Sequence, residues 1–443
     1  MLSRLRHLDN KYRIRECFTP QWFTFSMSWG LVALLLRLLP VSIYLNHENL
    51  SSFLENTAKL IFFTDCFYIS LFLSLLCSSK IAITNAFNKI PNMFFLGAIL
   101  MNFATFISSL GVLFKIGLTS FVIWWIDVVL AFALFFYTFL EIVSHQKYRF
   151  KLPEEMNAAL LLPALPMITA SAAGAAITPW QTSGTLSAVT LLTSYILLGF
   201  GAFVAFIIIF FFFGKLLMSG RPKGQIAHTT WICLGPIGYV ADTILKLARY
   251  ADTVKWPTDK LNLFGETVTT SVFWIGLMLW GAGLCMFIFS WSFSVEAIYE
   301  AKKANTFKFG LGWWTIIFPF ATLTFSTYEL VNYTQYLFFY IISWTFCTLT
   351  CVLALCFHVT TIYRSIFKAD EWWPVFWPKE EIDHDQVVLG NINVGNSLTT
   401  QRVGRSHEFE DHVRHSLDPN FEDYLRHAYP NDYSTITGTS VRV

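Results

Sequence analysis

The chain alternates between two kinds of apolar stretch. Odd-numbered stretches are interrupted by proline and by small or hydroxyl residues, whereas even-numbered ones are denser in bulky side chains. Residues 161–176, LLPALPMITASAAGAA, typify the first kind, and residues 203–214, FVAFIIIFFFFG, typify the second. Helices rich in small and hydroxyl residues can line a pathway, and bulky apolar side chains suit lipid. The alternation therefore predicts that the odd helices are inner and the even helices outer.

The apolar stretches are long enough to cross a membrane as helices, which takes about 20 residues. The sequence therefore predicts an all-α integral membrane protein with ten transmembrane helices. The sixth, eighth and tenth stretches are long enough that each could be split in two. The predicted spans are 18–40, 57–78, 92–114, 118–143, 156–177, 183–217, 229–250, 265–299, 310–330 and 334–366.

Five prolines recur along the odd stretches at a nearly constant interval. Pro20, Pro91, Pro163, Pro236 and Pro319 are separated by 71, 72, 73 and 83 residues. A repeat of this length predicts five helical hairpins, each with an odd helix going out and an even helix returning. We expect the last three prolines to lie inside their helices, where each frees a backbone carbonyl. The alternative is that proline is simply common in membrane helices.

Composition and charge placement support this class. Charged residues make up 14% of the chain, whereas globular domains carry about 25%. Lys and Arg concentrate in the segments on the same side as the N-terminus, so the positive-inside rule predicts that both termini are cytosolic. We predict three parts: a basic cytosolic N-terminus (1–17), a ten-helix transporter domain (18–368) and a cytosolic, mostly disordered tail (369–443) that lacks apolar periodicity. Asn49 and Asn332 begin glycosylation sequons in loops predicted to lie outside.

The sequence carries no recognisable catalytic motif. It has no nucleophile elbow, no zinc-binding His-Glu-x-x-His helix and no phosphate-binding Gly-rich loop. We therefore expect neither an enzyme nor a bound metal or other cofactor, and no nucleic-acid partner.

Ionisable residues within the predicted spans are candidate functional groups because each is costly in lipid. Asp242 and Lys246 lie four residues apart, so they can form a local ion pair or act in a relay. Asp127 fits either a hydrogen bond between helices or a proton relay. Asp65 is a weaker candidate of the same kind.

The odd helices offer hydroxyl and proline positions that could line a pathway. The alternative for each hydroxyl is close helix packing. Because the set lacks both a carboxylate ring and fixed cations, it suits an anion that passes without tight binding. The candidate lining residues are Ser26, Ser28, Thr105, Ser108, Thr169, Ser171, Pro236, Pro319, Thr322 and Ser326.

Four motifs carry a resemblance to a known family: FTPQWFTFSMSWG (18–30), LLPALPMITASAAG (161–174), LGPIGYVAD (234–242) and GWWTIIFPFATLTFSTYEL (312–330). They resemble the tellurite-resistance/dicarboxylate transporter family, which includes plant slow anion channels. The resemblance extends over 18–368. It implies five hairpins around a central pore made by the odd helices, a homotrimer, and a phenylalanine that plugs the pore. In this chain that residue is Phe318, with Phe320 as the second candidate.

Within the family, three segments look closer to fungal sulfite efflux pumps than to malic acid permeases. They are WWID (124–127), LGPIGY (234–239) and YELVNYTQY (328–336). The resemblance implies a multi-pass plasma-membrane transporter or channel that exports sulfite through a Phe-gated pore in the lipid bilayer. The alternatives are a C4-dicarboxylate (malate) transporter, proton-coupled through Asp127 or Asp242, and a membrane enzyme or scaffold without transport.

Overall fold

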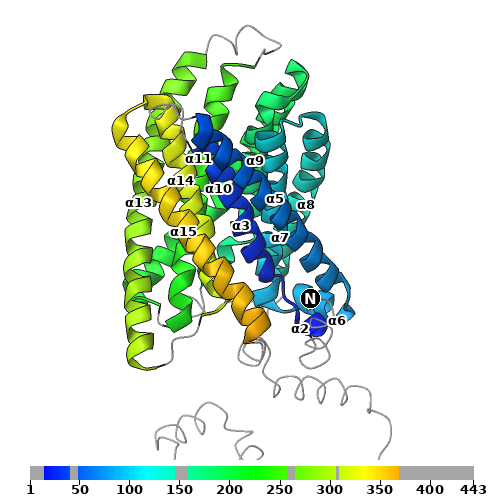
Figure 1. The fold of residues 1–443 in the computed structure, drawn as a ribbon, viewed down its shortest axis with the longest axis vertical. Helices are drawn as coiled ribbons and strands as arrows, with labels where there is room; N and C mark the ends of the chain where they lie inside the picture. The colour runs from blue at the N-terminus through cyan, green and yellow to red at the C-terminus, as the bar shows by residue number, and fades with distance from the viewer. Residues whose placement is uncertain are drawn as a thin grey trace, which may run out of the picture. The chain divides into compact units, whose positions relative to one another are not determined.

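A computed structural model describes residues 14–39, 48–144, 157–222, 224–254, 256, 265–305 and 309–368. Their regular elements are all helices (Figure 1). The chain divides into two units, residues 1–378 and 379–443, and every described residue belongs to the first. The predicted tail at 369–443 and most of the predicted N-terminal segment lie outside the described residues.

Each of the ten predicted stretches overlaps one long helix of the described chain. The helices matching the sixth, eighth and tenth stretches are unbroken, so the splits left open by the sequence do not occur. The α-helices are α2 (Ile14–Cys17), α3 (Trp22–Leu38), α5 (Glu48–Cys77), α6 (Lys80–Asn88), α7 (Ile90–Phe114), α8 (Leu118–Ser144), α9 (Leu165–Ile177), α10 (Gly184–Ser219), α11 (Trp231–Ala251), α13 (Gly265–Lys303), α14 (Ile317–Thr334) and α15 (Leu337–Phe367). The 3-10 segments are η2 (Ala158–Leu161), η3 (Thr178–Trp180), η4 (Gly224–Thr230) and η5 (Leu311–Thr315).

Seven of the described helices are long and apolar enough to cross a membrane: α5, α7, α8, α10, α11, α13 and α15. The others that match predicted spans, α3, α9 and α14, are shorter, with 17, 13 and 18 residues. The protein is therefore an all-helical, multi-pass membrane protein.

Two of the three prolines predicted inside helices lie at helix starts instead. Pro163 falls between η2 and α9, and Pro319 lies in the first turn of α14. Only Pro236 lies inside its helix, α11. Proline is tolerated in a first turn because its missing N–H would have no helical partner there. The prediction of interior breaks at Pro163 and Pro319 was therefore wrong, and 3-10 segments interrupt the chain at these places.

The helices form two sets by burial and contact. We call α3, α7, α9, α11 and α14 the inner helices. Each contacts two others of the set, in the order α3, α7, α9, α11, α14 and back to α3. The apolar window of α11 is 94% buried, whereas those of α5, α8, α10, α13 and α15, the outer helices, are only 22–39% buried. Each outer helix packs across two adjacent inner ones. The order of the inner helices around the set is thus the order of the odd stretches along the chain.

Glycines allow these helices to approach closely. A Cβ at Gly238 of α11 would overlap the Thr322 hydroxyl and lie 2.9 Å from the Leu323 backbone nitrogen of α14. A Cβ at Gly174 of α9 would lie 2.8 Å from the Trp124 ring of α8. Small residues at such contacts permit tight packing where no hydrophobic driving force acts between helices in lipid.

The two sequons lie in helices rather than in loops. Asn49 is exposed in the first turn of α5, which starts nine residues before the predicted span. Asn332 is half-buried in the last turn of α14. The predicted loop placement of both was wrong because polar helix ends carry no apolar signal.

Candidate functional site

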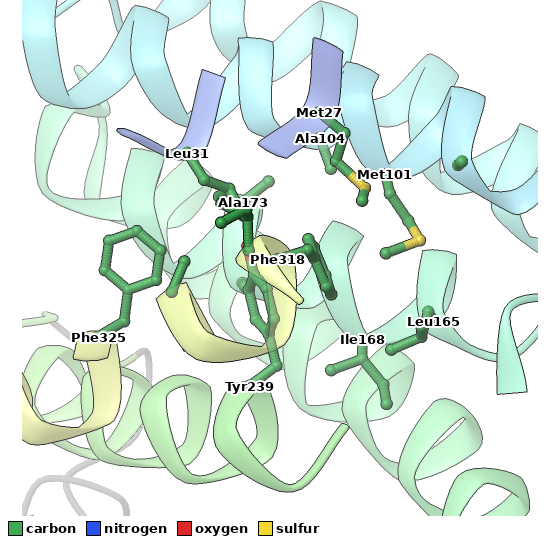
Figure 2. Packing of buried hydrophobic residues seen from close by; sticks show 14 of the residues in the cluster. Met27, Leu31, Met101, Ala104, Leu165, Ile168, Ala173, Tyr239, Phe318 and Phe325 are labelled. Carbon is green, nitrogen blue, oxygen red and sulfur yellow. The ribbon is translucent and has the colours of Figure 1, made fainter. Parts of the chain in front are cut away.

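Phe318 lies at the centre of the inner helices. Its side chain is 3% exposed, and Figure 2 shows it between apolar side chains of these helices. Its ring is stacked on Tyr239 of α11, with centroids 5.5 Å apart. The other labelled neighbours in this view are Met27, Leu31, Met101, Ala104, Leu165, Ile168, Ala173 and Phe325.

Gly235 of α11 has no side chain and so leaves room for the ring of Phe318. A Cβ added at Gly235 would lie 3.4 Å from the Phe318 ring and 3.7 Å from Pro319. Gly235 immediately precedes Pro236, the proline inside α11. The two candidate lining prolines therefore lie on adjoining segments of α11 and α14, next to the ring of Phe318.

Phe320 points to a different place. Its ring packs against Phe287 of α13 and Phe346 of α15, with centroids 5.0 and 5.4 Å away. These partners belong to outer helices. Of the two phenylalanines that the sequence offered for a plug, Phe318 lies among the inner helices, and Phe320 packs outward from them.

The candidate lining hydroxyls are engaged with protein groups. Ser26 donates to Asp65 of α5 at 2.5 Å, and Ser171 donates to the Ser194 carbonyl of α10 at 2.6 Å. Ser28 donates to the Trp314 carbonyl at 3.3 Å. The remaining hydroxyls, Thr105, Ser108, Thr169, Thr322 and Ser326, donate to carbonyls three or four residues earlier on their own helices. Among the candidate lining residues, Ser108 lines a cavity between the inner helices.

A cavity of about 170 Å³ lies between the C-terminal portions of all five inner helices. We call it the C-terminal pocket. Because the same end of each helix contributes to it, the five inner helices run in one direction. It is lined by Leu34, Arg37, Leu38, Ser108, Val112, Ala172, Ala176, Trp180, Tyr239, Asp242, Lys246, Arg249, Tyr250, Phe325, Tyr328 and Glu329.

Two ion pairs lie in the C-terminal pocket. Lys246 Nζ is 2.8 Å from Asp242 Oδ2, and Arg249 Nη2 is 2.9 Å from Glu329 Oε2. The carboxylates are deeply buried, at 1% and 0% exposure of their side chains, whereas 34% of the Arg249 side chain is exposed. Lys246 also lies over the Phe325 ring, 5.3 Å from its centroid. Pairing offsets the desolvation of these charges, and removal of one partner would leave the other buried alone.

A third cation, Arg37, lies near the end of α3 and lines the same pocket. Its Nε is 3.8 Å from Glu55 Oε2 of α5. Helix C-termini carry partial negative charge, so cations are favoured there. The pocket thus gathers three cations and two carboxylates at the negative ends of five helices.

The structure contains the ion pair that the sequence allowed between Asp242 and Lys246. Asp127 lies apart on α8, and neither of its buried carboxylate oxygens has a hydrogen-bond partner among the described residues. Sequence reasoning missed Arg249 and Glu329 as a pair. Arg249 follows Asp242 by seven residues and so shares its helix face, but Glu329 lies 80 residues further along the chain. Within the described ranges, no three His, Cys, Asp or Glu side chains gather in a metal-binding group.

Helices that cross a membrane, five parallel inner helices and a pocket rich in cations together describe a membrane protein built to pass an anion. Residues 17–362 match the family model SLAC1, described as voltage-dependent anion channel. The chain belongs to this family. This confirms the predicted resemblance to the slow anion channels.

The chain is also similar to named fungal transporters. It is 26% identical over 369 residues to the sulfite efflux pump SSU1 of Arthroderma benhamiae, across 79% of this chain and 92% of that protein. It is 26% identical over 298 residues to the pump of the same name from Saccharomyces cerevisiae, across 56% and 65% of the two chains. An uncharacterized transporter of Methanocaldococcus jannaschii is 23% identical over 190 residues, across 41% of this chain and 50% of that protein.

Proposed function

We propose that the protein exports sulfite across the plasma membrane through a pore between the inner helices, with Phe318 as its gate. The observation that carries this proposal is the position of Phe318, buried among all five inner helices of a member of an anion channel family. The similarity to proteins named sulfite efflux pumps supports the choice of anion. The named relatives give no support to the malate alternative, and the transporter family gives none to an enzyme.

The proposal takes the ten long helices as ten spans arranged in five hairpins. The short inner helices reach further than their α-helical lengths suggest because 3-10 segments extend them. Segments η2 and η3 flank α9, so the helical stretch runs from 158 to 180 with one break, and η5 precedes α14. Non-helical backbone at membrane depth is tolerated where protein surrounds it, and outer helices cover these segments.

Both termini are cytosolic in this proposal, the tail at 369–443 included. The N-terminal ends of the inner helices then face the cytosol. Segment η4, which precedes α11, contacts both η2 and η5 there. A helix N-terminus carries about half a positive charge. Five such ends around one mouth attract anions and repel cations. We also propose the homotrimer that the family resemblance implied, with one pore in each subunit.

No energy source beyond the membrane potential is required. An inside-negative potential favours anion exit by about 2.3 kcal/mol per charge for each 100 mV. A gated pore therefore suffices for efflux, and the two ion pairs of the C-terminal pocket need not carry protons.

The test is sulfite efflux from vesicles that hold the purified protein, with the potential set by a potassium gradient and valinomycin. We expect efflux to rise steeply with an inside-negative potential and to persist without a pH gradient. Efflux of labelled malate in place of sulfite, or efflux that depends on a pH gradient, would reject the proposal. Sulfite resistance of a host that lacks its own exporter, with and without the chain, gives the cellular counterpart.

A further inference from the structure

We propose that the C-terminal pocket is an anion-binding exit site, in which Glu329 is a tethered competitor that the departing oxyanion displaces from Arg249. The ligand class is a small oxyanion of sulfur, such as sulfite or sulfate. The inference rests on the proposed function for the direction of transport. It adds a second site, separate from the gate, where the anion is bound before release.

The pocket has the size and the connection that such a site requires. Its volume is about 170 Å³, and a single water needs only roughly 10–15 Å³ of such a cavity. A small oxyanion therefore fits together with several waters. Tyr239 lines the pocket and also stacks on Phe318. An anion that passes the gate therefore enters the pocket directly.

The pocket also holds guanidinium donors that no described residue satisfies. Arg249 bonds Glu329 through Nη2, whereas its buried Nε has no hydrogen-bond partner among the described residues. The same is true of Nε in Arg37, which lies 3.8 Å from Glu55 Oε2, beyond hydrogen-bond distance. Buried donors without partners are costly unless a ligand or water binds them. Guanidinium groups match oxyanions through paired hydrogen bonds.

The carboxylates explain why such a site would release its ligand. Arg37, Lys246 and Arg249 alone would hold an oxyanion tightly at the point where it must leave. Glu329 and Asp242 occupy Arg249 and Lys246 when the anion is absent. Of the two, Glu329 pairs with the more exposed cation, at 34% against 11% for Lys246. Arg249 is therefore the cation that can turn from its carboxylate toward the anion.

The experiment measures the thermal unfolding of the purified full-length protein in detergent as sodium sulfate replaces sodium gluconate at constant sodium concentration. Gluconate is a carboxylate and not an oxyanion of sulfur, and constant sodium removes any effect of the cation. Because a ligand that binds only the folded state stabilises it by RT ln(1 + [L]/Kd), the unfolding temperature of the wild type should rise with sulfate, and a fit of that rise gives the half-saturating concentration. Freshly dissolved sulfite serves as the second titrant.

Two variants should change the half-saturating sulfate concentration in opposite directions. Glu329→Gln removes the competitor and leaves Arg249 free for the anion, so the half-saturating sulfate concentration should fall by about tenfold. Adding Arg249→Gln to this variant removes the donor without leaving an unpaired buried carboxylate, and half-saturation should rise again by about tenfold or more. A purely structural ion pair would not give tighter binding on losing one partner.

A matched control removes another ion pair, outside the C-terminal pocket. Arg221 pairs with Glu296 at 2.5 Å and with Glu300 at 2.7 Å, and all three side chains are partly exposed. Arg221→Gln with Glu296→Gln and Glu300→Gln should therefore leave half-saturation unchanged. The inference is overturned if the unfolding temperature of the wild type does not rise with sulfate, or if Glu329→Gln binds sulfate no more tightly. Sulfite efflux without this binding pattern rejects the exit site and keeps the proposed function. The binding pattern without sulfite efflux keeps the anion-binding site and rejects the proposed function.

Discussion

The ring of Phe318 lies almost parallel to the ring of Tyr239, with 24° between their planes and 5.5 Å between their centroids. This pair joins α14 to α11 at the centre of the inner helices. An aromatic pair of this kind contributes about 0.5–1.5 kcal/mol beyond its buried area. A contact of that strength is weak enough for the proposed gate to open.

Replacing Phe318 by Ala should raise sulfite flux. The substitution removes the ring from the centre of the inner helices and leaves a methyl group, so the pathway stays open. Flux from vesicles at a fixed potential is the measurement, with the amount of folded protein checked by gel filtration. Phe320→Ala is the matched control because that ring packs on outer helices, and it should leave the flux of folded protein unchanged. Unchanged or abolished flux in folded Phe318→Ala protein would contradict the gate.

Replacing Tyr239 by Leu should raise basal flux by less than Phe318→Ala does. Leucine removes the stacking partner, so the Phe318 ring spends more time displaced, but the ring itself remains. A loss of about 0.5–1.5 kcal/mol corresponds to a change of roughly two- to tenfold in the open population. Tyr239→Phe keeps the stack and should behave as wild type. Equal basal flux in Tyr239→Leu and Tyr239→Phe would show that stacking does not hold the proposed gate closed.

Replacing Gly238 by Ala should destabilise the protein by about 1–3 kcal/mol, as overpacking of a tight contact does. The new methyl would collide with Thr322 and with the backbone of Leu323, which cannot move aside without shifting α14. The measurement is thermal unfolding in detergent. Gly281→Ala is the control because an added Cβ meets nothing within 4 Å on this exposed position of α13. Equal stability of the two variants would contradict the close approach of α11 and α14.

The helices were predictable from the sequence because a long apolar run between polar segments has few alternatives in a membrane. The start of α5 was not, since residues 48–56 are largely polar and give no apolar signal. Only the family resemblance placed Phe318 ahead of Phe320. Side chains two residues apart on a helix point about 200° away from each other, so which of the two faces the other inner helices depends on a helix rotation that packing determines.

The charges of the C-terminal pocket were harder still to predict. Asp242 and Lys246 are visible as a pair because they lie on one helix. Arg249 and Glu329 meet only because α11 and α14 are neighbours in space. The surroundings of Phe318 also differ from what the hydroxyl pattern suggested, since apolar side chains such as Leu31 lie there, while the hydroxyls bond carbonyls or other protein groups.

Replacing Asp127 by Asn should leave stability equal or higher and flux unchanged. Its carboxylate oxygens are buried without a hydrogen-bond partner among the described residues, so a neutral amide of the same shape removes a costly charge. Asp65→Leu is the comparison because it takes the acceptor from Ser26, and it should cost about 1–3 kcal/mol. Thermal unfolding and sulfite flux are measured for both. A stable Asp127→Asn protein without flux would place Asp127 in the transport step.

Glycosylation should occur at Asn49 and not at Asn332. Asn49 is exposed in the first turn of α5. Asn332 is half-buried, and its sequon is held in the helix: the Thr334 hydroxyl donates to the Leu330 carbonyl at 2.7 Å, and the Tyr333 hydroxyl donates to the Leu245 carbonyl at 2.9 Å. An acceptor sequon must be accessible, and in the proposed topology both sequons lie on the outer side of the membrane, where only Asn49 is exposed. Treatment of the expressed protein with a glycosidase, followed by electrophoresis, should show a mobility shift that Asn49→Gln abolishes and Asn332→Gln preserves.

Ser51→Ala destroys the same sequon while keeping Asn49 and should match Asn49→Gln. A shift that survives Asn49→Gln and disappears with Asn332→Gln would show that the end of α14 opens before the protein is fully folded.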